Sequence, residues 1–275
     1  MGKHWVIAIG INQYQWLPQL PYAANDTNAF SSWFRNSLSI GRVYHLADIC
    51  SEVIVDGGAA LPGQPTYANI KQFLQLRFST PFLEPDDVLW FLFSGHGLQF
   101  VDRDYLMCAD SEPMQAEQTA IAINDLVSCL KRGGTEKIVL LLDACHSQVQ
   151  PFGQGFGTDP EDVIAIFGSH FGQMSQQIDQ IQQGVFTYAL LESLRSLNST
   201  RTDHLEELYS ALCNQMTYLC EKYALTPQTP RLRVPSSLVP ASISTPQFDD
   251  RSIEILAPLL AKQRMEELTL KSMPW

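Results

Sequence analysis

Two apolar stretches of the sequence each lead into a short polar cluster that holds a base or a nucleophile. Residues 87–93 run into Ser94-Gly95-His96-Gly97, and residues 137–142 run into Asp143-Ala144-Cys145-His146-Ser147. A free thiol has a pKa of about 8.5 and is mostly protonated at neutral pH, so it needs a nearby imidazole to act as a nucleophile. These residue types predict nucleophilic catalysis by Cys145, with His96 as the general base that later protonates the leaving amine.

The two clusters meet only if their strands are neighbours. In open α/β sheets the reactive groups lie just beyond the carboxyl ends of the strands, and adjacent strands are about 5 Å apart. His96 and Cys145 would then project into one crevice. The glycines beside His96 allow close approach of a substrate, and the N–H groups of Gly97 and Cys145 are candidate donors to a developing oxyanion.

Other interpretations of these residues stay open. A single cysteine at a strand end is usually a small buried hydrophobe, and a single histidine there is usually structural. The joint pattern favours catalysis, but a catalytically idle module that serves as a scaffold is an alternative. His146 competes with His96 as the base, although adjacent residues of an extended segment point to opposite sides.

The elements that must position these residues alternate along the chain. Near-continuous apolar runs are typical of parallel strands covered on both faces, and apolar residues at helical spacing lie between them. This order predicts an α/β doubly wound fold. Asn25 and Asp26 lie near the start of the first predicted helix and are capping candidates. The predicted strands are 5–11, 52–55, 87–94, 137–143 and 162–167, and the predicted helices are 23–38, 66–78, 184–197 and 203–223.

Composition narrows the partners. The chain has 275 residues and a formal net charge of −11, which disfavours nucleic acid and is compatible with basic peptide substrates. We find no signal-peptide or membrane-span pattern, so we expect no membrane contact and a cytoplasmic location. The six cysteines lack zinc-ligand spacing, and a disulfide framework is not expected.

Two segments have the composition of loops, and the second of them contains a predicted domain boundary. Residues 148–162 and 227–247 are rich in Gly, Pro or Ser, and 257–271 has the pattern of an amphipathic helix. We predict a catalytic domain over 1–235 and a C-terminal extension over 236–275. The extension is either a helix packed on the domain or a docking or dimer segment, and the oligomeric state is open.

The two clusters together resemble the histidine and cysteine motifs of the caspase-like cysteine peptidase clan. The Asp-x-Cys-x-Ser form is similar to metacaspases and to their bacterial relatives, the orthocaspases, because true caspases carry a Gln-Ala-Cys type of motif. The resemblance covers roughly residues 4–235. Further matching segments are 10–12, 20–26, 105–107 with Asp110, and 184–190.

This resemblance implies a caspase–hemoglobinase fold, with about six mostly parallel strands and a last, antiparallel strand near 231–234. It implies amide hydrolysis through an acyl-enzyme. It also implies that Asp26, Asp143 and the neutral Ser94 hold an Arg or Lys side chain before the cleaved bond, because two carboxylates match one guanidinium. A peptidase with another pocket preference remains an alternative.

The resemblance also bears on cofactors and self-processing. Asp110 and Asp125 match parts of the calcium site of many metacaspases, but Asn124 and Phe152 stand where further acidic residues are expected. Calcium favours several carboxylates, so we expect activity without calcium and no other cofactor. No Lys or Arg lies between Lys137 and Arg195, so a basic-specific enzyme would leave its loop 148–162 intact; exposed candidates for self-cleavage elsewhere are Arg103, Arg132, Arg195 and Arg201.

Overall fold

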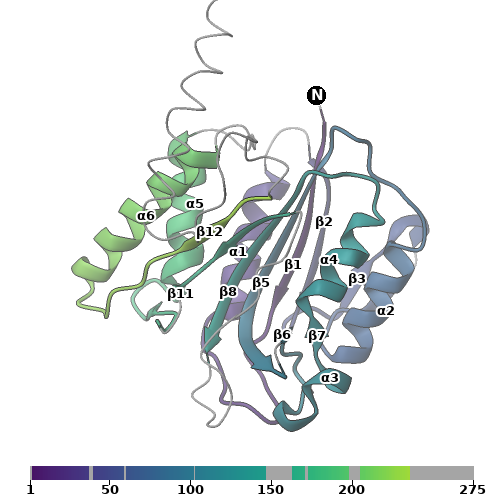
Figure 1. Cartoon of the computed structure of the whole chain (residues 1–275), viewed down its shortest axis with the longest axis horizontal. Helices are drawn as coiled ribbons and strands as arrows, with labels where there is room; N and C mark the ends of the chain where they lie inside the picture. The colour runs from purple at the N-terminus through teal and green to yellow at the C-terminus, as the bar shows by residue number, and fades with distance from the viewer. Residues whose placement is uncertain are drawn as a thin grey trace, which may run out of the picture.

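A twisted, mostly parallel sheet runs through the centre of the computed structural model (Figure 1). The structure describes residues 2–36, 40–58, 60–101, 103–146, 163–170, 173–197 and 205–235, without the side chains of residues 56, 145 and 146. Within these residues, the six strands of the main path follow the order β12-β9-β8-β5-β1-β2, and β6 and β7 extend the sheet beside β5. The bounds are β1 His4–Gly10, β2 Ile40–Ala47, β5 Val88–Phe100, β6 Arg103–Leu106, β7 Ile121–Ala122, β8 Ile138–His146, β9 Ile164–Phe167 and β12 Arg231–Arg233.

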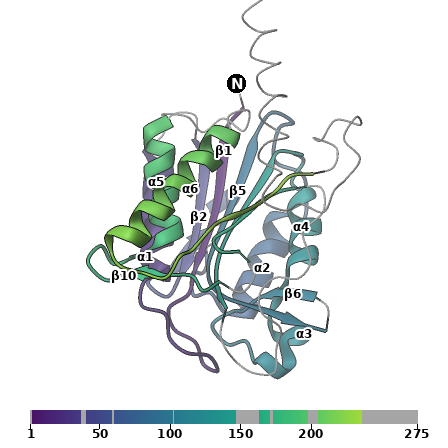
Figure 2. The same cartoon turned by 60° about the vertical axis from the view of Figure 1, so that its left-hand side comes forward.

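The strand directions confirm the predicted fold class. β1 is parallel to β2 and β5, β8 is parallel to β5 and β9, and β12 is antiparallel to β9. The family resemblance implied this antiparallel last strand near 231–234. The arrangement is an α/β fold with helices on both faces of the sheet (Figures 1 and 2), as the resemblance implied.

Alternate residues of the central strands pack into two separate hydrophobic cores. Ile7 and Phe91 lie in the core that also contains residues of α2 (Tyr67–Arg77) and α4 (Ile123–Lys131). Val6 and Trp90 lie in the opposite core, with α1 (Ala23–Arg35), α5 (Val185–Leu197) and α6 (Leu205–Lys222). Burial on both faces explains why the strands are almost continuously apolar.

Several elements differ from those expected. The segment 52–55 is not part of the central sheet, because β3 (Glu52–Ile54) pairs with β4 (Ala60–Pro62) in a separate hairpin. The strand beside β1 is instead β2, whose polar residues Arg42 and His45 interrupt the apolar pattern of a strand at the sheet edge. Short elements that the sequence did not predict are η1 Asp56–Gly58, η2 Pro113–Gln115, α3 Ala116–Thr119, β10 Gln177–Ile178 and β11 Gln183–Gly184, together with α4, β6 and β7.

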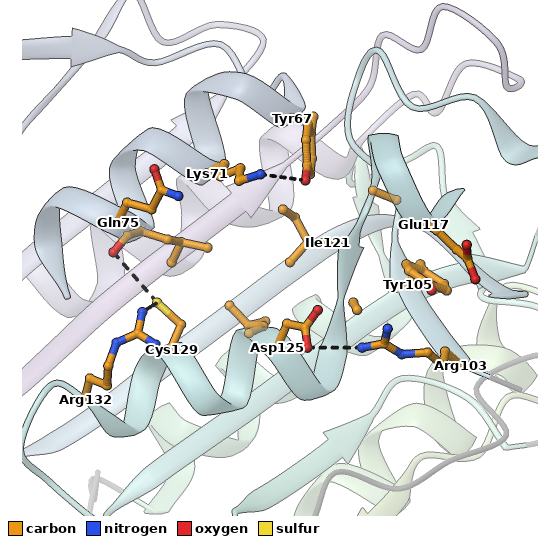
Figure 3. Close-up of a pocket in the computed structure, with 14 residues that line it drawn as sticks. Tyr67, Lys71, Gln75, Arg103, Tyr105, Glu117, Ile121, Asp125, Cys129 and Arg132 are labelled. Carbon is orange, nitrogen blue, oxygen red and sulfur yellow. Dashed lines mark hydrogen bonds and ion pairs between the residues drawn. The ribbon is translucent and has the colours of Figure 1, made fainter. Parts of the chain in front are cut away.

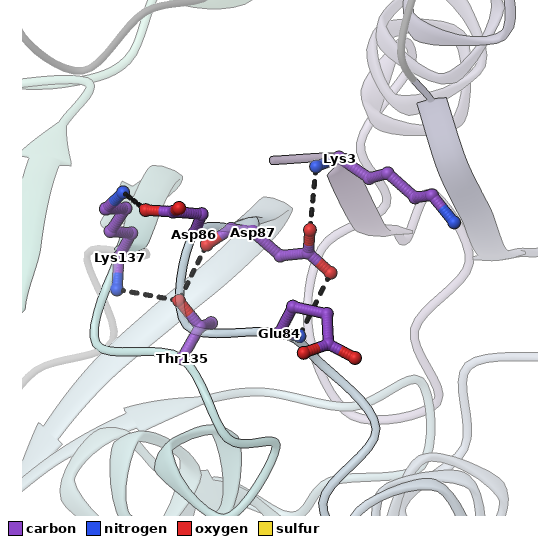
Figure 4. A network of polar contacts seen from close by, with 6 residues as sticks. All are labelled: Lys3, Glu84, Asp86, Asp87, Thr135 and Lys137. Atoms are coloured by element: carbon purple, nitrogen blue, oxygen red, sulfur yellow. Dashed lines mark hydrogen bonds and ion pairs between the residues drawn. The ribbon is translucent and has the colours of Figure 1, made fainter. Parts of the chain in front are cut away.

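A buried carboxylate joins the amino-terminal ends of the central strands (Figure 4). Asp87 accepts hydrogen bonds from the main chain of Lys3 and Glu84 and from the indole of Trp5, at 2.7, 3.2 and 2.9 Å. The hydroxyl of Thr135 donates to the carbonyl oxygen of Asp87 at 2.6 Å. These bonds compensate the burial of the carboxyl group and connect β1, β5 and the segment before β8.

The cap of α1 comes from a residue far from the one predicted. Asn12, just after β1, accepts the N–H of Ala24 at 2.7 Å, and the N-cap residue Tyr22 makes no side-chain capping bond. Neither of the capping candidates Asn25 and Asp26 caps this helix, because both lie inside its first turns. Asp26 is buried, which leaves its carboxylate available for a contact other than capping.

The loop 148–162, the amphipathic segment 257–271 and the extension 236–275 lie outside the described residues. None of the helices in the described part of the chain has the length and apolarity that a membrane-spanning helix needs.

Candidate active site

The strands that carry the histidine and cysteine motifs are neighbours, as the sequence predicted. β5 and β8 lie side by side and pair in parallel (Figure 1). The register sets His96 opposite Cys145 and Ser94 opposite Asp143. Two motifs about fifty residues apart in sequence thus meet at the carboxyl ends of adjacent strands. The main chain of Cys145 lies beside that of His96. The structure describes the main chain of Cys145 and not its side chain.

The His96 imidazole is buried and held in one orientation. Its Nε2 lies 2.8 Å from the carbonyl oxygen of Pro18, in the loop between β1 and α1. A carbonyl oxygen only accepts hydrogen bonds, so Nε2 carries the hydrogen and Nδ1 is the nitrogen that can take up a proton. The ring of Tyr14, in the same loop, lies against the imidazole with a centroid distance of 4.7 Å.

The candidate oxyanion donor Gly97 is in a different setting from the one expected. The sequence predicted that its strand ends near Ser94, whereas β5 continues to Phe100. Gly97 pairs with Leu106 of β6 on one side and with His146 of β8 on the other. Gly97 therefore lies within the sheet, directly beside the main chain that carries Cys145, and its role as an oxyanion donor stays a prediction.

Two buried carboxylates, Asp26 of α1 and Asp143 of β8, converge beside Ser94 and Gly184. Asp26 of α1 accepts hydrogen bonds from the Ser94 hydroxyl at 3.1 Å and from the Gly184 N–H at 2.9 Å. Asp143 of β8 accepts a bond from the Thr187 hydroxyl at 3.3 Å. A Cβ atom added to Gly184 would lie 3.0 Å from an oxygen of each carboxylate, so these oxygens are at most about 6 Å apart. The structure therefore brings together Asp26, Asp143 and Ser94.

Burial and mutual repulsion perturb this carboxylate pair. Burial raises the pKa of Asp143 from 3.8 to about 6, against the lowering effect of hydrogen bonds from Ser175 and Thr187. Burial, followed by the negative charge of Asp143, raises the pKa of Asp26 well above its usual value. A cationic group bound between two buried carboxylates that repel each other would stabilise both of them.

Sequence reasoning missed several residues of this site. Tyr14 and Pro18 lie in a loop without secondary structure, and no local pattern marks a residue whose function is to contact a distant histidine. Thr187 and Gly184 belong to the segment 184–190, which matched the family without an assigned role. Their proximity to Asp26 or Asp143 depends on how α5 packs against α1 and the sheet.

The two acidic residues considered for calcium have protein partners. Asp110 accepts the N–H of Tyr67 at 2.7 Å, and Asp125 pairs with Arg103 at 3.1 Å. Asp125 lines a cavity of about 270 Å³ between α2, α4 and β6, which neither His96 nor the Asp26–Asp143 pair lines (Figure 3). Among the described residues, no group of three or more His, Cys, Asp or Glu side chains is arranged to hold a metal ion.

Comparison with known proteins identifies the family. The model of the caspase domain, a peptidase family, matches residues 3–239, so the chain belongs to the caspase-domain peptidases, a family of cysteine peptidases that act on proteins. No curated protein matches it in sequence.

Several solved structures share its fold. A protein from Geobacter sulfurreducens has a TM-score of 0.58 and 16% identity, with 90% of this chain and 98% of that chain covered. Caspase-1 from Spodoptera frugiperda has a TM-score of 0.52 and 15% identity, with 84% and 86% covered.

Proposed function

We propose that the chain is a cysteine endopeptidase of the metacaspase and orthocaspase type, which cleaves after Arg or Lys. Cys145 is the nucleophile, His96 is the general base, and Asp26, Asp143 and Ser94 bind the basic side chain. The observation that carries the proposal is the buried carboxylate pair of Asp26 and Asp143. Asp143 lies two residues before Cys145 on β8, and Asp26 of α1 is bonded to Ser94, two residues before His96 on β5.

The reaction uses the imidazole as a proton carrier. His96 takes the thiol proton of Cys145 at Nδ1, since Nε2 is bound to the carbonyl oxygen of Pro18. The thiolate attacks the scissile carbonyl carbon, and the N–H groups of Gly97 and Cys145 stabilise the oxyanion. The imidazolium then protonates the leaving amine, which departs and leaves an acyl-enzyme. A water molecule, deprotonated by His96, hydrolyses the thioester and restores the thiol.

The carboxylate pair supports a preference for a basic side chain. An Arg side chain between two carboxylates forms charge-assisted bonds with both, and the hydroxyl of Ser94 already bonds to Asp26. An Asp side chain in the same position would add a third negative charge to a buried site. The geometry around Gly184 therefore favours Arg or Lys and disfavours the Asp preference of true caspases.

A fluorogenic peptide panel with Arg, Lys, Asp or Asn before the cleaved bond tests the proposal. We expect cleavage of the Arg and Lys peptides alone, and its loss in Cys145→Ala. The matched control is Cys213→Ala, since this half-buried cysteine of α6 lies outside the proposed site. Cleavage after Asp or Asn would indicate another pocket specificity, and an absence of cleavage throughout the panel would favour the idle scaffold.

A further inference from the structure

The strand that carries His96 changes its neighbour at the histidine. Upstream, β5 pairs with β1 as far as Ser94, and the N–H of Ile11 donates to the Ser94 carbonyl at 3.0 Å. Downstream, β5 pairs with β6 from Gly97 onward. His96 lies in the gap between the two neighbours, so no strand residue accepts its N–H on that side. A buried N–H without an acceptor would be destabilising.

The hydroxyl of Tyr14 fills this gap. It accepts the N–H of His96 at 2.8 Å and lies 3.5 Å from the carbonyl oxygen of Met107, to which it donates. The N–H of Met107 in turn donates to the carbonyl oxygen of His96 at 3.0 Å. One side-chain hydroxyl thus connects the backbone of β5 at His96 with the residue that follows β6.

The same tyrosine contacts the imidazole. Its ring centroid is 4.7 Å from that of His96, and the side chain is 5% exposed. Gly95 makes this approach possible, because a Cβ atom there would lie only 2.5 Å from the Tyr14 hydroxyl. The glycine before the histidine therefore makes room for a tyrosine. The sequence had predicted that it makes room for a substrate.

The loop holds Tyr14 from its other side. The side-chain amide of Gln19 accepts the N–H of Tyr14 at 2.9 Å and donates to its carbonyl oxygen at 2.7 Å. Gln15 donates its N–H to the carbonyl oxygen of Ala109 at 2.8 Å. Pro18, whose carbonyl binds His96 Nε2, is the residue before Gln19. One loop thus fixes both the main chain and the ring of the histidine.

We propose that Tyr14 is a positioning residue for His96, which holds the imidazole in the orientation needed for proton transfer with Cys145. The proposal rests on the proposed function, since it assumes that His96 is the general base. Tyr14 acts through the histidine: its hydroxyl anchors the backbone from which the imidazole projects, and its ring restricts the movement of the imidazole. Removal of the hydroxyl should impair the chemical steps more than substrate binding.

The test compares Tyr14→Phe with Tyr44→Phe. Tyr44 is a matched control, because its buried hydroxyl also accepts an N–H, from Arg77 Nε at 2.7 Å, but on β2 at the sheet edge. For each variant, the measurements are Tm, kcat and KM on the Arg peptide. The rate of Cys145 alkylation by iodoacetamide is followed from pH 5 to 9 by site-resolved mass spectrometry.

We expect Tyr14→Phe to lower kcat about 10- to 100-fold, with KM within about twofold of wild type, because small misplacements of a catalytic group cost this much. Cys145 alkylation should slow, with its pH midpoint shifted upward, because a misplaced imidazolium stabilises the thiolate less. Tyr44→Phe should lower Tm without these effects. Gly95→Ala would place a methyl group against the Tyr14 hydroxyl. This substitution should lower kcat when it is introduced into the wild type, and should lower it less when it is introduced into Tyr14→Phe, which lacks the hydroxyl.

Three results would overturn the proposal. The first is a kcat of Tyr14→Phe within twofold of wild type. The second is a loss of kcat in both tyrosine variants in proportion to their loss of Tm, which would indicate a structural role alone. The third concerns the dyad itself: if His96→Ala leaves Cys145 alkylation unchanged, the proposed function fails and the role of Tyr14 fails with it, whereas the first two results leave the proposed function intact.

Discussion

Replacement of Asp143 by Asn should make the protein more stable and less active at the same time. Asp143 is 5% exposed and Asp26 is 1% exposed, and their nearest oxygens flank the same point above Gly184. Without a bound substrate, these two carboxyl groups repel each other in a buried site. The amide of Asn keeps an oxygen that can accept the hydroxyl of Thr187, but it carries no charge.

The pKa of Asp143 sets the size and the sign of the stability effect. Its rise from 3.8 to about 6 corresponds to about 3 kcal/mol at neutral pH. The folded protein binds this proton more tightly than the unfolded chain, so the free energy of unfolding of the wild type falls as the pH rises from about 4 to about 6. The side-chain amide introduced by Asp143→Asn does not titrate. Above pH 6 the free energy of unfolding of the variant should therefore exceed that of the wild type by up to about 3 kcal/mol, which corresponds to a rise in Tm of several degrees. Near pH 4 the two free energies of unfolding should be equal.

The activity should change in the opposite direction. Loss of one member of a buried charge pair costs about 2–5 kcal/mol, so kcat/KM on the Arg peptide should fall by about 30-fold to several thousand-fold. Calorimetry from pH 4 to 7 and the peptide assay measure the two effects. Asp86→Asn is the control, because Asp86 is an exposed carboxylate paired with Lys137, and it should show neither the gain in Tm nor the loss of cleavage.

Three outcomes would refute this reasoning. One is a lower Tm of Asp143→Asn than of wild type at pH 7. Another is a difference in Tm between Asp143→Asn and wild type that stays constant from pH 4 to pH 7, which would show that the stability effect does not come from the titration of Asp143. The third is unchanged cleavage after Arg, which would show that Asp143 does not bind the basic side chain.

Three further predictions concern the pocket, calcium and self-processing. Gly184→Ala should place a methyl group 3.0 Å from both carboxylates and lower cleavage of Arg peptides at least about tenfold, and normal turnover would contradict the pocket geometry. Because Asp125 pairs with Arg103, turnover should be the same in a chelator and in millimolar calcium; a titration that changes the rate more than twofold would show that calcium is needed. Mass spectrometry of incubated enzyme should find no new terminus within 148–162, since no Lys or Arg lies between Lys137 and Arg195; such a terminus would argue against basic specificity.

The sequence by itself determined the class of fold and the pair of motifs. Apolar runs such as 87–93 and 137–142 are local patterns, and residues buried on both faces of a parallel strand must be apolar whatever the neighbours are. The adjacency of His96 and Cys145 could be predicted because parallel strands end at one edge of the sheet. The ends of the strands and the existence of β2 could not be predicted. A strand continues as far as a neighbouring strand offers hydrogen bonds, and the residues of the segment itself do not reveal where that neighbour lies.

Only the tertiary structure decided how the site is held. Asp26 and Gly184 are 158 residues apart, and their bond exists because α1 and α5 pack on the same face of the sheet. Asn12 rather than Asp26 caps α1, which leaves Asp26 to face Asp143. Tyr14 reaches His96 because β5 exchanges β1 for β6 at that residue. Such contacts depend on the register of separate strands and on loop conformation, which long-range packing sets and local residue patterns do not record.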